Sequence, residues 1–199
     1  MTRYRKYLQA KDNGCQRGFG IEADFNYSFG FSPEKSVFIQ GRGGLMLDHY
    51  GRDFIRDRVN RSRPDILILE IGTNDLTDQV HPSTLADNVQ NLCSELRRRY
   101  SVKYIVLLQV VQRRKTRQCP RAEFDQTRLS YNRRIQHQAQ NNRYMYVFRH
   151  DRSILVNIKE GEVSKDNIHV TSALGMQLYH FSLRKAIKVA MDGINYRSQ

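Results

Sequence analysis

The sequence predicts a three-layer α/β fold, in which helices cover both faces of a parallel β-sheet. The first indication is a pair of continuous apolar runs, residues 65–72 and 103–111, which are typical of strands buried on both faces. The second is the helical spacing of apolar residues between these runs, which begins after Ser83 and Thr84 as candidate caps. The third is the alternation of strand-like and helix-like segments, which favours parallel strands joined by helical crossovers.

Each predicted element follows from a local pattern. Residues 36–40 are rich in β-forming side chains and end at a glycine-rich turn. Pro64 separates a polar, helix-like stretch from the first apolar run, and the apolar residues from Leu85 to Leu96 recur at helical spacing. In chain order the predicted elements are strand 36–40, helix 45–60, strand 65–72, a helix starting at 83, strand 103–111, helix 123–142, strand 144–148 and helix 172–191.

Length and composition favour one soluble domain. The chain has 199 residues, of which 39% are hydrophobic and 27% are charged, an ordinary globular composition. No apolar run approaches the roughly 18 residues needed to cross a bilayer, and the amino terminus lacks the apolar core of a signal peptide. We therefore expect a single domain over residues 1–199, with no membrane span and a cytoplasmic location.

Positive charge is concentrated in the second half of the chain. The net charge is +13; residues 1–100 carry 15 basic and 13 acidic side chains, whereas residues 101–199 carry 18 and 7. The excess is densest between Arg113 and Arg134. This region is either a solvated helix face with a charged loop, or a surface that binds nucleic acid through its phosphates. Few aromatic residues lie among these arginines, and the sequence contains no recognised nucleic-acid module.

The three cysteines indicate neither a disulfide framework nor a metal site. Cys15, Cys93 and Cys119 are far apart in the sequence, without a C-x-x-C motif or matching histidine pairs. Cys93 falls on the apolar stripe of a predicted helix, so we expect it to be buried. We expect reduced thiols and no bound metal.

Three polar clusters follow predicted strands or precede the last helix. They are the glycine turn 41–44, the segment 72–75 and the segment 166–169. In parallel α/β sheets, ligands bind beyond the carboxyl ends of the strands. The clusters are therefore predicted to converge on one candidate site.

The residues of these clusters have chemistry suited to acyl transfer. Asp166 and His169 are three positions apart, so one helical turn can place a carboxylate beside an imidazole and leave the second ring nitrogen free as a base. Asn74 can donate its amide to a developing oxyanion, and Gly43 or Gly44 can offer a backbone N–H. Taken singly, each has a plainer interpretation: a helix-capping Asp, a surface His, an Asx-turn, or a turn that needs positive φ.

Together and in this order, the clusters resemble the SGNH (GDSL-like) hydrolase superfamily of esterases and lipases. The resemblance covers roughly residues 36–190. Its strongest parts are the strand with its G-x-N-D block and the D-x-x-H block with the Gly, Tyr and Leu-Arg positions that follow. The matching segments are QGRGGL (40–45), ILILEIGTND (66–75), the pair Tyr131-Asn132, and DNIHVTSALGMQLYHFSLRKAI (166–187), which includes Gly175, Tyr179, Leu183 and Arg184.

The resemblance implies a flavodoxin-like parallel sheet and a serine nucleophile. Carried over to this sequence, Asp166 orients His169, His169 acts as the base, and Gly44 and Asn74 donate to the oxyanion. The implied substrate is a small-molecule, carbohydrate or lipid ester, including an acetyl group on a sugar or lipid. No metal or organic cofactor is implied.

One part of the family pattern is missing. No Gly-Asp-Ser block on a first strand occurs near the start, and Met1–Leu8 resembles the helix that normally opens with the nucleophile. We therefore expect an N-terminally truncated domain that lacks its inner first strand, with a gap between 36–40 and 65–71. We expect such a chain to be inactive or severely impaired as a hydrolase. The alternatives are a non-catalytic pseudoenzyme and a nucleic-acid-binding module that uses the basic region 113–134.

Overall fold

A parallel three-stranded sheet forms the centre of the protein. The computed structural model describes residues 22–26, 31, 37–42, 44–113, 115–116, 118–150 and 173–197. The strands β3 (Ile66–Leu69), β4 (Tyr104–Leu108) and β5 (Met145–Phe148) lie in the order β3-β4-β5, and both pairs are parallel. All five residues of β4 are buried, as their continuous apolar run predicts for a central strand.

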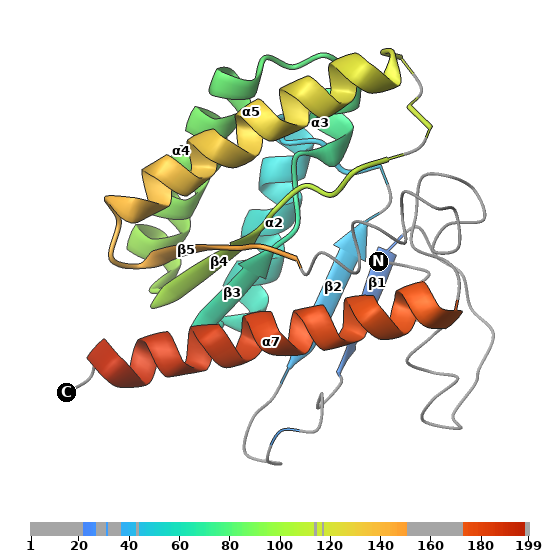
Figure 1. Ribbon diagram of the computed structural model, residues 1–199. Helices are drawn as coiled ribbons and strands as arrows, with labels where there is room; N and C mark the ends of the chain where they lie inside the picture. The colour runs from blue at the N-terminus through green and yellow to red at the C-terminus, as the bar shows by residue number, and fades with distance from the viewer. Residues whose placement is uncertain are drawn as a thin grey trace.

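Helices cover both faces of this sheet, which confirms the predicted three-layer α/β fold (Figure 1). α7 (Ala173–Arg197) crosses one face, and the other helices lie on the opposite side. Those helices are α2 (His49–Ser62), α3 (Thr73–Thr77), α4 (Pro82–Tyr100) and α5 (Arg121–Gln140). The short helix α3 was not predicted, and α7 continues six residues beyond its predicted end.

Two apolar clusters hold these layers together. On the α4 side, Leu85, Leu92 and Leu96 are almost completely buried, which confirms the predicted stripe of α4. Cys93 is buried on the same stripe, and desolvation raises the pKa of its thiol to about 12. On the opposite face, alternate side chains of β4, including Val106, pack with α7. Each face of the sheet is therefore covered by its own helices.

The predicted strand at 36–40 exists, but its predicted place in the parallel sheet is wrong. β2 (Phe38–Arg42) pairs antiparallel with β1 (Glu22–Asn26) in a separate two-stranded sheet. The backbone N–H and C=O groups of a strand need hydrogen-bond partners. For β2 these partners come from β1, which is close to it in the sequence, and not from β3.

The two sheets are not joined by strand pairing, because one edge of β3 pairs with no described strand. Within the described residues, β3 is hydrogen-bonded only to β4, although the β1–β2 pair lies on the β3 side of the sheet (Figure 1). Ile66, Leu67 and Ile68 are only partly buried, in contrast to the fully buried β4. This is the position at which a gap was expected, between 36–40 and 65–71.

Among the described helices, none combines the length and apolar character that a bilayer span requires.

Candidate active site

A glycine turn at the end of β3 delivers two polar side chains to the carboxyl edge of the sheet. Gly72 has φ +99°, and an added Cβ would lie 3.2 Å from Leu85 Cδ2 and 3.3 Å from the Tyr131 ring. Only glycine combines this left-handed conformation with so close an approach. The chain can therefore turn directly from β3 into α3, whose second and third residues are Asn74 and Asp75.

Asn74 and Asp75 together hold the loop that follows β2. Asn74 Nδ2 donates to the Leu45 carbonyl at 2.9 Å, and the Leu47 N–H donates to Asp75 Oδ1 at 2.7 Å. These bonds join residues 28 and 29 positions apart in the sequence. Two hydrogen bonds thus hold residues 45–47, which follow the glycine turn 41–44, against the G-x-N-D block 72–75, with which that turn was predicted to converge.

Gly44 lies one residue before the carbonyl that Asn74 binds. It is exposed and has φ +73°, with no atom within 4 Å of an added Cβ, so its backbone conformation rather than crowding requires glycine. Asn74 uses one amide hydrogen for Leu45, and the same NH2 group carries a second. Gly44 and Asn74, the two predicted oxyanion donors, are therefore neighbours; Gly43 lies outside the described residues.

Arg113 also reaches this edge, which the sequence did not predict. Its Nη2 lies 3.5 Å from Asn74 Oδ1, a long contact that places a guanidinium next to the amide. Arg113 follows β4, so the carboxyl ends of two neighbouring strands contribute to the site. Its position a few residues after the buried strand β4 was the available signal, but its neighbours in the sequence place it in the basic region 113–134.

Asp166 and His169, the predicted orienting acid and base, lie outside the described residues. The helix that follows them is firmly placed, because the Tyr179 hydroxyl donates to the Glu70 carboxylate at the carboxyl end of β3. The His150 ring, beyond β5, stacks on Tyr179 with centroids 5.8 Å apart. α7 is therefore fastened to the same edge of the sheet that carries Asn74. Glu70 could have been noticed as a charged residue within an apolar strand run.

A serine–histidine pair does occur in the described structure, but it is unsuited to nucleophilic catalysis. His150 Nδ1 lies 2.9 Å from Ser182 Oγ. Ser182 is 0% exposed and His150 5% exposed, so no substrate reaches the hydroxyl. Ser182 also lies within a long helix rather than on a sharp strand-to-helix turn. The pair is a buried polar contact between β5 and α7.

Asp75 is a buried carboxylate with one oxygen unpaired. Its side chain is 3% exposed, and Oδ2 has no hydrogen-bond partner among the described residues. Burial raises the pKa of Asp75 above its ordinary value, and the bond from the Leu47 N–H opposes this shift only in part. The folded protein therefore binds this proton more tightly than the unfolded chain does.

Asp75→Asn is expected to weaken the pH dependence of stability. The pKa of Asp75 is higher in the folded protein than its ordinary value of 3.8. The contribution of Asp75 to the free energy of unfolding therefore falls as the pH rises from 3.8 through the pKa of the folded state. Asparagine keeps the acceptor for the Leu47 N–H but cannot ionise. Urea unfolding from about pH 4 to about pH 7 checks this, with Asp192→Asn on the exposed side of α7 as the control. Equal slopes in the Asp75→Asn variant and the wild type would contradict it.

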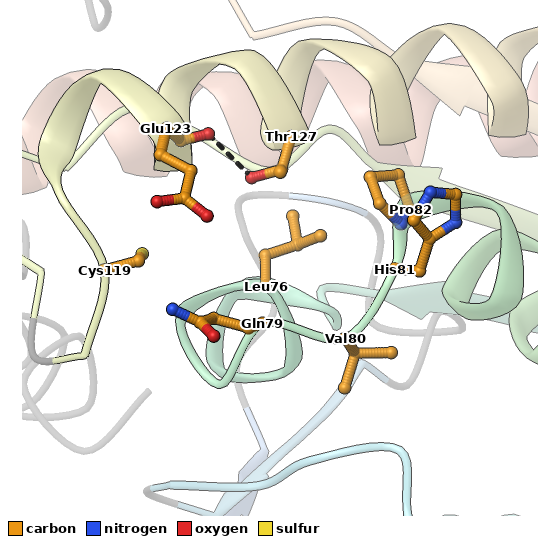
Figure 2. A pocket seen from close by; sticks show the side chains of 8 residues that line it. All are labelled: Leu76, Gln79, Val80, His81, Pro82, Cys119, Glu123 and Thr127. Carbon is orange, nitrogen blue, oxygen red and sulfur yellow. Dashed lines mark hydrogen bonds between the residues drawn. The ribbon is translucent and has the colours of Figure 1, made fainter.

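A small hollow of about 160 Å³ lies between the segment after α3 and the start of α5 (Figure 2). Leu76, His81 and Cys119 are among its lining residues. Burial, followed by the charge of Glu123, raises the pKa of the Cys119 thiol, which keeps it protonated and weakly nucleophilic. Leu76 is two positions from Asn74, so the two side chains face different sides of α3. The hollow is therefore separate from the candidate active site.

No three His, Cys, Asp or Glu side chains gather as metal ligands in the part of the chain that the structure describes. The expectation that the protein uses no metal or organic cofactor stays a prediction.

The described structure is an α/β domain with a parallel sheet, and the carboxyl edge of that sheet carries the loop after Gly44, which Asn74 and Asp75 clamp. The chain belongs to the GDSL-like lipase/acylhydrolase family, whose model matches residues 15–174. This confirms the SGNH (GDSL-like) resemblance at the level of the family. No curated protein matches the chain significantly.

One solved structure supports the fold, and a second is similar over a shorter part of the chain. A carbohydrate esterase of family 3 from Talaromyces cellulolyticus is similar with a TM-score of 0.58 and 16% identity, over 76% of this chain and 71% of that one. A protein from Streptococcus pneumonia described as a platelet activating factor matches with a TM-score of 0.49 and 21% identity, over 61% of this chain and 58% of that one. At such identities the first similarity establishes the fold alone.

Proposed function

We propose that this domain is built for serine-type hydrolysis of esters. The observation that carries this proposal is the double clamp of Asn74 and Asp75 on the loop of Gly44, at the carboxyl edge of the sheet. The clamp holds two donors near one another before a substrate arrives, and such preorganisation is usually the largest electrostatic contribution to acyl transfer. Family membership supports the same chemistry.

The proposed mechanism assigns one role to each predicted residue. A serine Oγ attacks the ester carbon while His169 takes the hydroxyl proton, and Asp166 stabilises the resulting imidazolium. The carbonyl oxygen becomes an oxyanion that Gly44 N–H and Asn74 Nδ2–H stabilise. His169 then returns the proton to the leaving alkoxide. Water releases the acyl group from the serine in the same way.

We further propose that the nucleophile lies on a strand that pairs with the open edge of β3. Supporting this are the lack of hydrogen bonds between β2 and β3 and the partial exposure of Ile66, Leu67 and Ile68. A strand there would end at the same edge as Gly72, beside Asn74. In this proposal the nucleophile precedes Met1, and residues 1–199 alone are inactive or severely impaired.

The proposed substrate is an acyl or acetyl ester carried by a small molecule, a sugar or a lipid. This class comes from the family, and the similar fungal structure is that of a carbohydrate esterase.

The test compares residues 1–199 with the same chain extended before Met1 by a β-strand ending in Gly-Asp-Ser. The extended chain is expected to hydrolyse p-nitrophenyl acetate at pH 8, to react with a serine-directed fluorophosphonate, and to unfold at higher temperature. Residues 1–199 alone are expected neither to hydrolyse p-nitrophenyl acetate nor to react with the fluorophosphonate.

Two controls make this result specific. Replacement of the introduced serine by alanine, or His169→Ala in the extended chain, is expected to abolish hydrolysis. Strong hydrolysis by residues 1–199 that His169→Ala removes would show that the nucleophile lies within them. An extended chain that folds well but stays unlabelled would contradict the esterase function and leave a binding module on an esterase fold.

A further inference from the structure

The amino-terminal edge of the parallel sheet carries a dense group of arginines. The strands begin in register, with Ile66 opposite Tyr104 and Ile105 opposite Met145. The residues just before each strand are therefore side by side, and the Lys103 N–H donates to the Asp65 carbonyl at 2.9 Å. We call the following exposed side chains the basic edge: Arg63, Arg97, Arg98, Arg99, Lys103 and Arg143.

Two tyrosines lie within the basic edge and are covered by arginines. The Arg97 guanidinium lies 3.8 Å from the centre of the Tyr144 ring, which joins the last turn of α4 to the start of β5. The Arg63 guanidinium lies 5.7 Å from the Tyr100 ring. A guanidinium over an aromatic ring keeps its N–H groups available at its rim, where they can bind phosphate.

The positive charge of the basic edge exceeds what its surroundings neutralise. Lys103 pairs with Asp65 at 2.8 Å and Arg99 pairs with Glu95 at 3.1 Å. Within the described residues, Arg98 and Arg143 form no ion pair. Arg98 lies in the last turn of α4, and Arg143 follows the end of α5. A cation at the C-terminus of a helix interacts favourably with the helix dipole, but each helix C-terminus carries only about half a negative charge. Six cations against two carboxylates and three helix ends leave a clear excess.

The region predicted from the sequence as a basic surface is less suited to a polyanion. Arg128 is only 11% exposed and pairs with Asp125 at 3.2 Å, and Arg113 turns toward Asn74. Arg133 and Arg134 are exposed on α5 and form no ion pair within the described part of the chain. The charges of 113–134 are therefore divided between different environments rather than gathered on one surface.

We propose that the basic edge binds the phosphate backbone of single-stranded nucleic acid, at the end of the sheet opposite the candidate active site. Arginine outnumbers lysine five to one there, and its planar fork binds phosphate in a bidentate manner. The guanidinium planes of Arg63 and Arg97, which lie over the two tyrosine rings, offer flat surfaces on which unpaired bases can stack. A membrane surface would require exposed apolar anchors, but the large exposed apolar residues of the described chain lie on other segments, apart from Tyr146 on β5.

The test measures binding of a fluorescent 20-nucleotide oligouridylate to residues 1–199 by anisotropy, an assay that needs no catalytic serine. Binding is expected at 50 mM NaCl and is expected to weaken about 100-fold by 200 mM, as about five phosphate contacts imply. Arg98→Glu/Arg143→Glu is expected to weaken binding at least tenfold at 100 mM. Arg133→Glu/Arg134→Glu, with the same change of charge, is expected to weaken it less than threefold.

Other results would overturn the proposal. Equal losses in the two double variants would mean diffuse attraction by net charge, and no binding at 50 mM NaCl would exclude the site. Vesicles of phosphatidylcholine and phosphatidylserine that bind more tightly than the oligonucleotide, with the same loss in Arg98→Glu/Arg143→Glu, would assign the edge to membranes. Circular dichroism checks folding, and Arg98→Gln/Arg143→Gln repeats the comparison without new negative charge. Because this assay is independent of hydrolysis, its failure leaves the proposed esterase function untouched.

Discussion

Asn74→Ala in the extended, catalytically complete chain is expected to lower kcat by about 10²–10³, the usual effect of losing one oxyanion donor. The amide that would stabilise the oxyanion also holds the Leu45 carbonyl at 2.9 Å, so its loss removes a donor and loosens the loop of Gly44. KM is expected to change much less, because the oxyanion forms only in the transition state. Steady-state hydrolysis of p-nitrophenyl acetate measures both constants.

The control for this prediction is Asn141→Ala, at the exposed end of α5, which is expected to keep the parental kcat. Asn74 would be only a clamp for the loop if its replacement lowered the melting temperature while kcat stayed within a factor of two. In that case the Gly44 N–H would be left as the proposed oxyanion donor.

Asn132→Leu is expected to lower the free energy of unfolding by about 2–4 kcal/mol, because it leaves the buried Val110 N–H unpaired and leaves the Val110 carbonyl with only the long 3.5 Å contact from Arg128 Nη1. The Val110 N–H donates to Asn132 Oδ1 at 3.0 Å, and Asn132 Nδ2 donates to the Val110 carbonyl at 3.0 Å. Asn132 is 5% exposed and Val110 is 2% exposed, so water cannot replace these bonds.

Urea unfolding of Asn132→Leu and of Asn141→Leu measures this difference, since the second substitution makes the same chemical change on the surface. A loss below about 1 kcal/mol in Asn132→Leu would mean that the end of β4 rearranges to satisfy its own backbone. The pair of bonds fastens the segment between β4 and Arg113 to α5.

Elements whose pattern is local were predictable from the sequence. The apolar spacing of α4 and the continuous run of β4 both specify an element together with the side that must be buried. The pairing of β2 was not predictable in this way. A strand-like run indicates an extended segment, but its partner depends on which edges other segments leave open.

The roles assigned to the residues of the candidate site stay predictions, whereas some of their positions are described by the structure. Gly44 and Asn74 were identified from their places after predicted strands and from the family pattern, and the structure brings them together through Leu45. The clamp of Asp75 on Leu47 and the approach of Arg113 required three-dimensional information. Asp166 and His169 stay predictions, because they lie outside the described residues.

By itself, the sequence determined the class of fold and the resemblance to the family, because periodicity and short motifs are properties of neighbouring residues. The residues that it assigns to acyl transfer stay predictions. Only the tertiary structure decided which distant residues share a surface. Arg63, Lys103 and Arg143 are separated by about 40 positions each, yet the parallel register of β3, β4 and β5 aligns the segments that carry them. The basic edge arises from strand pairing, which no single stretch of sequence encodes, whereas the basic region visible in the sequence is dispersed by the packing of α5.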